Sequence, residues 1–164
     1  MKPQSALVIC PGRGTYNRQE LGYLAKNHQK QQLMLSEFDT RREALGQPSL
    51  TELDSAATYS TSRLTRGDNA SSLIYACAYA DFLSINREKF DLVGVAGNSM
   101  GWYIALACAG ALDTHRGFEV VNTMGTLMQN ALIGGQLLYP YVDENWVEIP
   151  DKRDELMALT HRIP

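Results

Sequence analysis

Residues 94–112 read GVAGNSMGWYIALACAGAL, and this stretch has the clearest structural pattern in the chain. The stretch begins in a short apolar run, reaches Ser99 between Gly97 and Gly101, and continues into a nearly uncharged segment. A strand that turns sharply into a helix has this pattern, because glycines on both sides of the turn let the two backbones approach closely. The stretch therefore predicts a strand–turn–helix unit with Ser99 at the turn.

The length and composition of the chain are those of a globular protein. Its 164 residues are 45% hydrophobic and 20% charged, which is enough apolar material for a buried core. The formal charge is −3 and the sequence has no run of basic residues, so nucleic acid is not expected as a partner. No apolar stretch is long enough to span a bilayer, and the N-terminus does not read as a secretory signal. Three separated cysteines, Cys10, Cys77 and Cys108, predict reduced, buried thiols in a cytoplasmic protein and no structural metal site.

Two strands with helices around them define the expected fold class. Residues 6–10 and residues 91–96 are short apolar runs, which predict interior strands of a parallel sheet. Strand, helices, strand and helix in this order are typical of an α/β fold. We therefore expect a short parallel sheet with flanking helices.

The two longest apolar helices are expected on either side of the second strand. Before that strand, spaced apolar residues up to Leu83 predict a core helix capped by Asp68 or Asn69. A loop rich in Ser and Thr is expected before the helix, over residues 46–67. After the strand, residues 100–111 are apolar nearly all round, which predicts a helix covered on every side.

The last third of the chain predicts three more elements. They are a helix capped by Asp113 or Thr114 that runs through Asn130, a strand over residues 136–142 and a charged helix over residues 151–162. No internal repeat is present, so these elements complete a single α/β pattern.

The Gly-x-Ser-x-Gly pattern around Ser99 is that of a nucleophile elbow. A serine at such a turn projects its hydroxyl above the sheet, and the next amide, that of Met100, points at the oxygen of an attacked carbonyl. The start of the helix adds a partial positive charge. The pattern alone leaves open a serine that merely caps a helix, and it does not say which acyl chemistry an elbow would serve.

Three short motifs follow one another along the chain. Residues 11–15 read PGRGT, residues 97–106 read GNSMGWYIAL followed by AGAL at 109–112, and residues 124–129 read MGTLMQ. The sequence resembles the acyltransferase family typified by malonyl-CoA:acyl carrier protein transacylase. That family has Pro-Gly-Gln-Gly-Ser, then Gly-His-Ser-Leu-Gly-Glu-Tyr-Ser-Ala-Leu with Ala-Gly-Ala-Leu, then Arg-Gly-x-x-Met-Gln. The resemblance covers roughly residues 5–142.

The resemblance implies both a fold and a reaction. The fold is an α/β-hydrolase-like acyltransferase core over residues 1–134, with the beginning of a ferredoxin-like small subdomain over residues 135–164. The reaction passes an acyl group from coenzyme A through an ester on Ser99 to the phosphopantetheine thiol of an acyl carrier protein, in fatty acid or polyketide biosynthesis. The backbone amides of Arg13 and Met100 would form the oxyanion hole. Acyl-CoA is then a donor substrate, and no bound cofactor or metal is implied.

Departures from the family motifs concern the acyl pocket, for which Asn98, Trp102 and Met124 are the expected residues. Met124 stands where malonyl-specific members have an arginine that pairs with the substrate carboxylate, so an uncharged acyl group is expected. Asn98 replaces the family's histidine, and Trp102 replaces its glutamate and also fits a core-filling role. Arg13 replaces a glutamine, and its charge leaves open a carboxylate contact, a phosphate contact or exposure to solvent.

The histidine that serves the family as a base has no counterpart in matching context. His28, His115 and His161 are each expected at the surface. We therefore expect the nucleophile-bearing half of an acyltransferase, incomplete as the chain stands, with the histidine supplied by a C-terminal half or by a second chain. The alternatives are an incomplete relative that binds a carrier protein or a partner chain, and a serine hydrolase with unrelated substrates. The motifs at residues 11–15 and 124–129 argue against the hydrolase.

Overall fold

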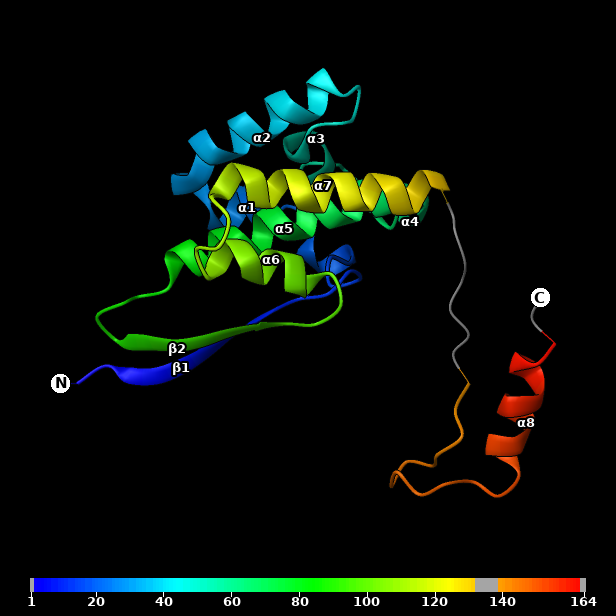
Figure 1. The fold of residues 1–164 in the computed structure, drawn as a ribbon. Coiled ribbons are helices and arrows are strands. Elements are labelled where there is room, and N and C mark those ends of the chain that lie inside the picture. Colours follow the sequence, from blue (N-terminus) through cyan, green and yellow to red (C-terminus); the bar gives the residue numbers. More distant parts are fainter. Residues whose placement is uncertain (1, 132–138, 163–164) are drawn as a thin grey trace. The chain divides into compact units, whose positions relative to one another are not determined.

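The computed structural model of the chain describes residues 2–131 and 139–162. It forms two compact units, Met1–Leu132 and Ile133–Pro164. The first unit is a mixed α/β unit, with helices on one side of two strands (Figure 1). The assignment of residues 1–134 to an acyltransferase core and of residues 135–164 to a small subdomain stays a prediction.

Two parallel strands form the sheet of the first unit (Figure 1). Strand β1 (Gln4–Cys10) pairs with strand β2 (Phe90–Gly97), and the register shifts once, between Ala6 and Leu7. Val8 and Val95 lie opposite each other and pack against the hydrophobic core. The predicted parallel pairing of the two apolar runs is confirmed.

The other face of the sheet is exposed, so the prediction of interior strands is wrong for the residues that the structure describes. Leu7 and Ile9 are 57% and 69% exposed, because alternate side chains of a strand point to opposite faces. Val93 on the neighbouring strand is 65% exposed. An apolar run therefore predicted the strands correctly, but it could not show that only one face is covered.

The helices of the first unit lie on one side of the strands (Figure 1). In chain order they are the 3-10 helix η1 (Arg18–Glu20), α1 (Tyr23–Asn27), the 3-10 helix η2 (Gln29–Gln31), α2 (Gln32–Ala44), α3 (Leu50–Asp54), α4 (Thr61–Leu64), α5 (Gly67–Ser84), α6 (Gly101–Cys108) and α7 (Thr114–Ala131). None of the helices that the structure describes is both long and apolar enough to cross a membrane.

Helix α5 is the core helix that the sequence predicts. Leu73 and Tyr75 are fully buried on it, and α7 packs along its length (Figure 1). The predicted start is wrong, since α5 begins at Gly67 and neither Asp68 nor Asn69 caps it. Leu83 was expected on the buried face, but it is 49% exposed because it lies in the last turn, where the helix leaves the core.

The predicted loop over residues 46–67 contains two short helices, α3 and α4. Ser49 caps α3, because its hydroxyl accepts a hydrogen bond of 3.0 Å from the amide of Glu52. Leu50 and Leu53 of α3 are fully buried. A serine-capped turn with two buried leucines is too short to stand out in a segment rich in Ser and Thr.

Arg42 of α2 is a fully buried cation that no sequence pattern indicated. Its guanidinium donates hydrogen bonds of 2.7 Å to the side-chain oxygens of Asn122 and Asn69, from α7 and α5. It also donates to the backbone oxygens of Pro48 and Asp68, at 2.7 and 2.9 Å. The arginine therefore fastens three helices to one another.

Helix α6 is not covered on every side, so that prediction is also wrong. Ile104 and Cys108 are buried, whereas Trp102 and Leu106 are 59% and 42% exposed. The apolar character of the helix therefore leaves an exposed apolar stripe on this unit.

Helices α7 and α8 (Lys152–Thr160) confirm the two helices that were predicted for the last third of the chain. Asp113 accepts a hydrogen bond of 2.8 Å from the amide of Arg116 at the start of α7, as expected of a cap. The predicted strand lies partly outside the described residues, at 136–138. Within its described part, Val142 forms an isolated antiparallel bridge with Glu148 and not a strand.

Candidate functional site

Ser99 lies at a sharp turn between the end of β2 and the start of α6. Its backbone has a φ of +52°, a left-handed conformation that a residue with a Cβ rarely adopts. The turn is closed by hydrogen bonds from the amide of Gly101 to the carbonyl of Asn98, at 2.8 Å, and from the amide of Trp102 to that of Ser99, at 3.1 Å. The predicted strand–turn–helix unit is therefore confirmed.

The two glycines that flank Ser99 are required by close backbone contacts. A Cβ added to Gly97 would lie 2.2 Å from the carbonyl carbon of Gly101. A Cβ added to Gly101 would lie 2.2 Å from the carbonyl oxygen of Cys10, at the end of β1. Real Cβ atoms do not approach other atoms this closely, so the turn has its shape only with glycine at both positions.

The loop at residues 11–15 lies directly against this turn. The amide of Asn98 donates a 3.1 Å hydrogen bond to the carbonyl of Cys10. A Cβ added to Gly12 would lie 2.9 Å from the carbonyl oxygen of Asn98 and 3.4 Å from the Cβ of Ser99. Two motifs that are far apart in the sequence therefore meet around the serine.

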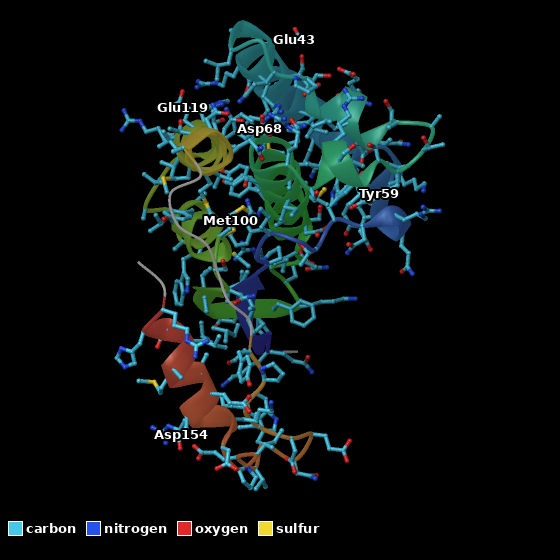
Figure 2. The ribbon with its side chains drawn as sticks, turned by 90° about the vertical axis from the view of Figure 1, so that its right-hand side faces the viewer. Glu43, Tyr59, Asp68, Met100, Glu119 and Asp154 are labelled. Carbon is cyan, nitrogen blue, oxygen red and sulfur yellow. The ribbon has the colours of Figure 1, made fainter. Side chains whose placement is uncertain are left out.

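Three polar groups around the serine have no hydrogen-bond acceptor or donor within residues 2–131 and 139–162. There, the hydroxyl of Ser99 forms no hydrogen bond, and the backbone amides of Arg13 and Met100 donate none. Met100 lies beside α6 in the side view of Figure 2, with its side chain partly buried against the core. The start of α6 places a partial positive charge next to Ser99, which suits an oxyanion.

The motif at residues 124–129 meets the same loop at the start of α5. The amide of Gly67 donates a 2.8 Å hydrogen bond to the side-chain oxygen of Gln129. A Cβ on Gly67 would lie 2.8 Å from the carbonyl oxygen of Gly125 and 3.0 Å from a guanidinium nitrogen of Arg13. Sequence reasoning missed Gly67 as a contact residue, since it read this glycine only as the end of a loop.

Several solved structures are similar to this chain. The chain is 27% identical to the malonyl-CoA–acyl carrier protein transacylase of Coxiella burnetii over 82% of this chain and 41% of that one, with a TM-score of 0.60. It is 25% identical to the malonyl-CoA:ACP transacylase of Synechocystis over 88% of this chain and 46% of that one, with a TM-score of 0.58. The chain is similar to malonyl-CoA:acyl carrier protein transacylases.

A third similar structure is that of a transacylase bound to another protein, the acyl carrier protein of a type II polyketide synthase. Its identity is 24% over 86% of this chain and 45% of that one, with a TM-score of 0.61. The chain therefore spans less than half the length of these three transacylases. Searches of protein-family models and of curated protein sequences found no match.

The three residues expected in the acyl pocket differ in exposure. Asn98 is exposed, Trp102 is 59% exposed and Met124 is half-buried on α7. A core-filling role for Trp102 is therefore wrong, because most of the indole faces solvent. The roles of the three residues in an acyl pocket, and of Ser99 as the nucleophile, stay predictions.

A mostly apolar cavity lies beside the turn and not at Ser99. It has a volume of about 350 Å³ and lies between β1 and α5. Cys10, Pro11 and Cys77 line it, whereas Ser99 and Met124 do not. The cavity is therefore adjacent to the loop at residues 11–15 and does not include Ser99.

The three histidines do not complete the site within the described residues, where none forms a hydrogen bond with Ser99. His28 is buried at 3% exposure, with a ring nitrogen 2.9 Å from Asp81, so its expected surface position is wrong. A single histidine in a polar segment carries no signal of burial, and the packing of α1 against α5 decides it. His115 is half-buried and pairs with Glu37, and His161 is exposed at the end of α8.

Proposed function

We propose that this chain is the nucleophile-bearing part of an acyltransferase that moves an acyl group from coenzyme A to an acyl carrier protein. The observation that carries the proposal is the geometry of Ser99. It is held at φ +52° between two required glycines, against a loop whose Arg13 amide faces no internal acceptor. A serine that merely caps a helix needs neither the left-handed backbone nor the opposing loop.

The proposed reaction has two transfers through one ester. In the first, the Ser99 oxygen attacks the thioester carbonyl, its proton leaves to a base, and coenzyme A departs as a thiol. The amides of Met100 and Arg13 would donate to the oxyanion that forms. In the second, the phosphopantetheine thiol of the carrier protein attacks the ester, and the proton returns to Ser99. No bound cofactor takes part in either transfer.

The acyl group that we propose is uncharged. Met124 occupies the position at which the resemblance places a carboxylate-binding arginine, and a thioether cannot pair with a carboxylate. An acetyl group or a longer aliphatic group therefore fits this position better than malonyl.

The acyl acceptor that we propose is an acyl carrier protein. One of the similar structures is a transacylase in complex with such a protein, and the partner class is carried over from there.

The base that we propose is a histidine outside residues 1–164, on a C-terminal half or a second chain. Two observations support this. The chain spans 41–46% of the similar transacylases described above. The sheet also leaves Leu7 and Ile9 exposed, whereas parallel sheets are ordinarily covered on both faces.

A second candidate function is a catalytically incomplete relative that binds a carrier protein or a partner chain without transferring an acyl group. The observation that favours it is that the Ser99 hydroxyl meets no histidine among the residues that the structure describes. Both candidates keep the fold, and they differ in whether Ser99 reacts.

The test is the intact mass of the protein after incubation with acetyl-CoA, malonyl-CoA and a longer acyl-CoA. Ser99→Ala is the inactive control, and Ser71→Ala is a control for a serine that is buried on α5. Acyltransfer predicts an adduct that disappears in Ser99→Ala and persists in Ser71→Ala. The mass of the adduct identifies the acyl group, and malonyl as the best donor would contradict the assignment of Met124.

The absence of an adduct with every donor leads to the second arm of the test. A polypeptide that continues through a histidine-bearing second half is then incubated with the same donors. An adduct at Ser99 in that longer polypeptide supports the acyltransferase. No adduct there, together with binding of a carrier protein, establishes the incomplete relative instead.

A further inference from the structure

We propose that Cys10 and Cys108 form a reversible disulfide when hydrogen peroxide oxidises Cys10, at the base of the turn that holds Ser99. The two sulfur atoms are 3.8 Å apart, and both cysteines are free thiols. Cys10 is the last residue of β1, and Cys108 is the last residue of α6. The pair therefore joins the strand that precedes the loop at 11–15 to the helix that follows the serine.

The oxidant reaches Cys10 through the cavity beside β1. Cys10 is only 3% exposed, but it lines that cavity of about 350 Å³ together with Ile9 and Pro11. Thr15 and Asp81, which also line it, are exposed, so the lining extends to the molecular surface. Hydrogen peroxide is little larger than water, and a space of this volume admits it readily.

The two sulfurs of the pair have different environments, and this selects Cys10 as the group that reacts first. The hydrogen bond between the two thiols lowers the pKa of Cys10. The same bond, together with burial, raises the pKa of Cys108. The thiolate is the form that reacts with peroxide, so Cys10 is oxidised first. Cys108 stays a thiol, in contact with the oxidised sulfur.

Cys77 lines the same cavity and is the internal control for this selection. Burial, and after it the charges of Asp54 and Asp81, raise the pKa of Cys77. A thiol that stays protonated reacts slowly with peroxide. Cavity access alone therefore does not make a cysteine reactive here, and the 3.8 Å partner distinguishes Cys10 from Cys77.

The proposed oxidation has two steps that balance. The Cys10 thiolate attacks one oxygen of hydrogen peroxide, which gives a sulfenic acid and releases hydroxide. The Cys108 sulfur then attacks the sulfenic sulfur, the disulfide forms, and water leaves with the thiol proton. Two thiols are oxidised by two electrons in total, and one peroxide is reduced. A dithiol such as dithiothreitol reverses the result by exchange.

The disulfide alters the turn that carries Ser99. Bond formation brings the sulfurs from 3.8 Å to about 2 Å, and we expect the end of α6 to shift toward β1 as the side chains close this distance. The start of α6 has no space to move toward β1, because Gly101 already lies against the carbonyl of Cys10. If the proposed acylation of Ser99 holds, its rate is expected to fall by about tenfold or more in the oxidised protein, because small displacements of reacting groups lower reaction rates by such factors.

The experiment oxidises the folded chain with hydrogen peroxide, removes the peroxide, and then unfolds the chain so that N-ethylmaleimide blocks every remaining thiol. The expected product is lighter by two hydrogen atoms before blocking and carries one maleimide, on Cys77. Peptide mapping without reduction is expected to find Cys10 joined to Cys108. In Cys108→Ser, which keeps a side-chain hydrogen-bond partner for Cys10, dimedone should trap a sulfenic acid on Cys10. Cys108→Ala removes that partner and should give less of the trapped acid, whereas Cys77→Ala should form the disulfide normally.

Two results would overturn the proposal. One is three maleimides on the protein that was treated with peroxide while folded and then unfolded for blocking, and the other is a disulfide that includes Cys77. The mapping uses no acyl-CoA, so a failure of the proposed acyltransfer leaves this result intact. In the acylation arm, an unchanged Ser99 acylation rate in protein shown by mapping to be oxidised would overturn the effect on the turn.

Discussion

The Cα of Gly101 lies so close to the end of β1 that an added methyl group would be 2.2 Å from the carbonyl oxygen of Cys10. Two strands and a helix therefore meet at a point where no side chain fits. Backbone contacts therefore fix the position of Ser99, because the end of β1, the loop at 11–15 and the first turn of α6 pack directly against one another.

The first prediction concerns Gly101→Ala, which should be strongly destabilising. The new methyl group meets backbone atoms of Cys10 and Pro11, which cannot rotate away, so the cost should be about 3 kcal/mol or more in free energy of unfolding. Urea denaturation measures it. Gly94→Ala is the matched control, because its methyl group meets only the flexible end of Leu7, at 3.0 Å. Equal losses in both variants would contradict the contact.

The second prediction compares two replacements of Ser99. Ser99→Ala keeps the strained backbone at φ +52°, whereas Ser99→Gly relieves it. The left-handed conformation costs a residue with a Cβ about 1–2 kcal/mol, and the extra freedom of glycine in the unfolded chain offsets part of this gain. Ser99→Gly should therefore be more stable than Ser99→Ala by about 1 kcal/mol in thermal unfolding. The reverse order would argue that the serine is not held under strain.

The third prediction concerns the buried guanidinium of Arg42. Arg42→Met leaves the side-chain oxygens of Asn69 and Asn122 without this donor, together with two backbone oxygens. The hydroxyl of Ser72 still donates to Asn122 and to the backbone oxygen of Asp68, whereas the oxygens of Asn69 and Pro48 lose the donor. The expected loss is about 3 kcal/mol or more, because a buried polar atom without a partner is costly. Arg41→Met is the control, since Arg41 is partly exposed and pairs at the surface with Glu119. A loss there should stay below about 1 kcal/mol.

The fourth prediction is a loss of stability in alkaline solution. Burial, and after it the hydrogen bond to Asp81, raises the pKa of Tyr23 to about 12 from an ordinary value of 10.0. The folded protein then keeps a proton that the unfolded chain releases, so this contribution is full below pH 10 and is lost as the pH rises through 12. In urea titrations across this range, Tyr23→Phe should lose stability less steeply than the unchanged protein. Parallel curves would contradict the assignment.

Local glycine chemistry explains which parts of the site the sequence could predict. Glycines on both sides of a residue at a strand end indicate that two backbone segments approach closely. The structure has this approach at Gly97 and Gly101. The meeting of the three motifs could be expected from the resemblance, because it depends on backbone contacts. Arg42 and Gly67 gave no such signal, since their roles depend on helices that come from distant parts of the chain.

Exposure could not be predicted in the same way. An apolar strand such as β1 is compatible with one covered face or with two, and the sequence of the strand is the same in both cases. The exposure of a strand face depends on which elements pack against it. Among the described residues, none covers Leu7 and Ile9, and their side chains face solvent. The same holds for Trp102, which the apolar run of α6 placed in the core.

The fifth prediction concerns Met124, and it depends on the proposed acylation of Ser99. Met124→Arg places a guanidinium on α7 beside Gly125, which packs against the start of α5. A bidentate contact with a carboxylate becomes possible there, so the ratio of malonyl to acetyl loading on Ser99 should rise about tenfold or more. Intact mass after short incubations measures the ratio.

The control for this charge is Met128→Arg, one helical turn further along α7, where the side chain is 56% exposed. It adds the same cation to the same helix, so a general attraction of malonyl-CoA would raise the ratio in both variants. A rise in Met124→Arg alone would assign the acyl pocket to the neighbourhood of Met124. A ratio that stays unchanged there would place the carboxylate site elsewhere, and Arg13→Gln, which removes the cation that lies beside Gly67, would then be expected to lower malonyl loading.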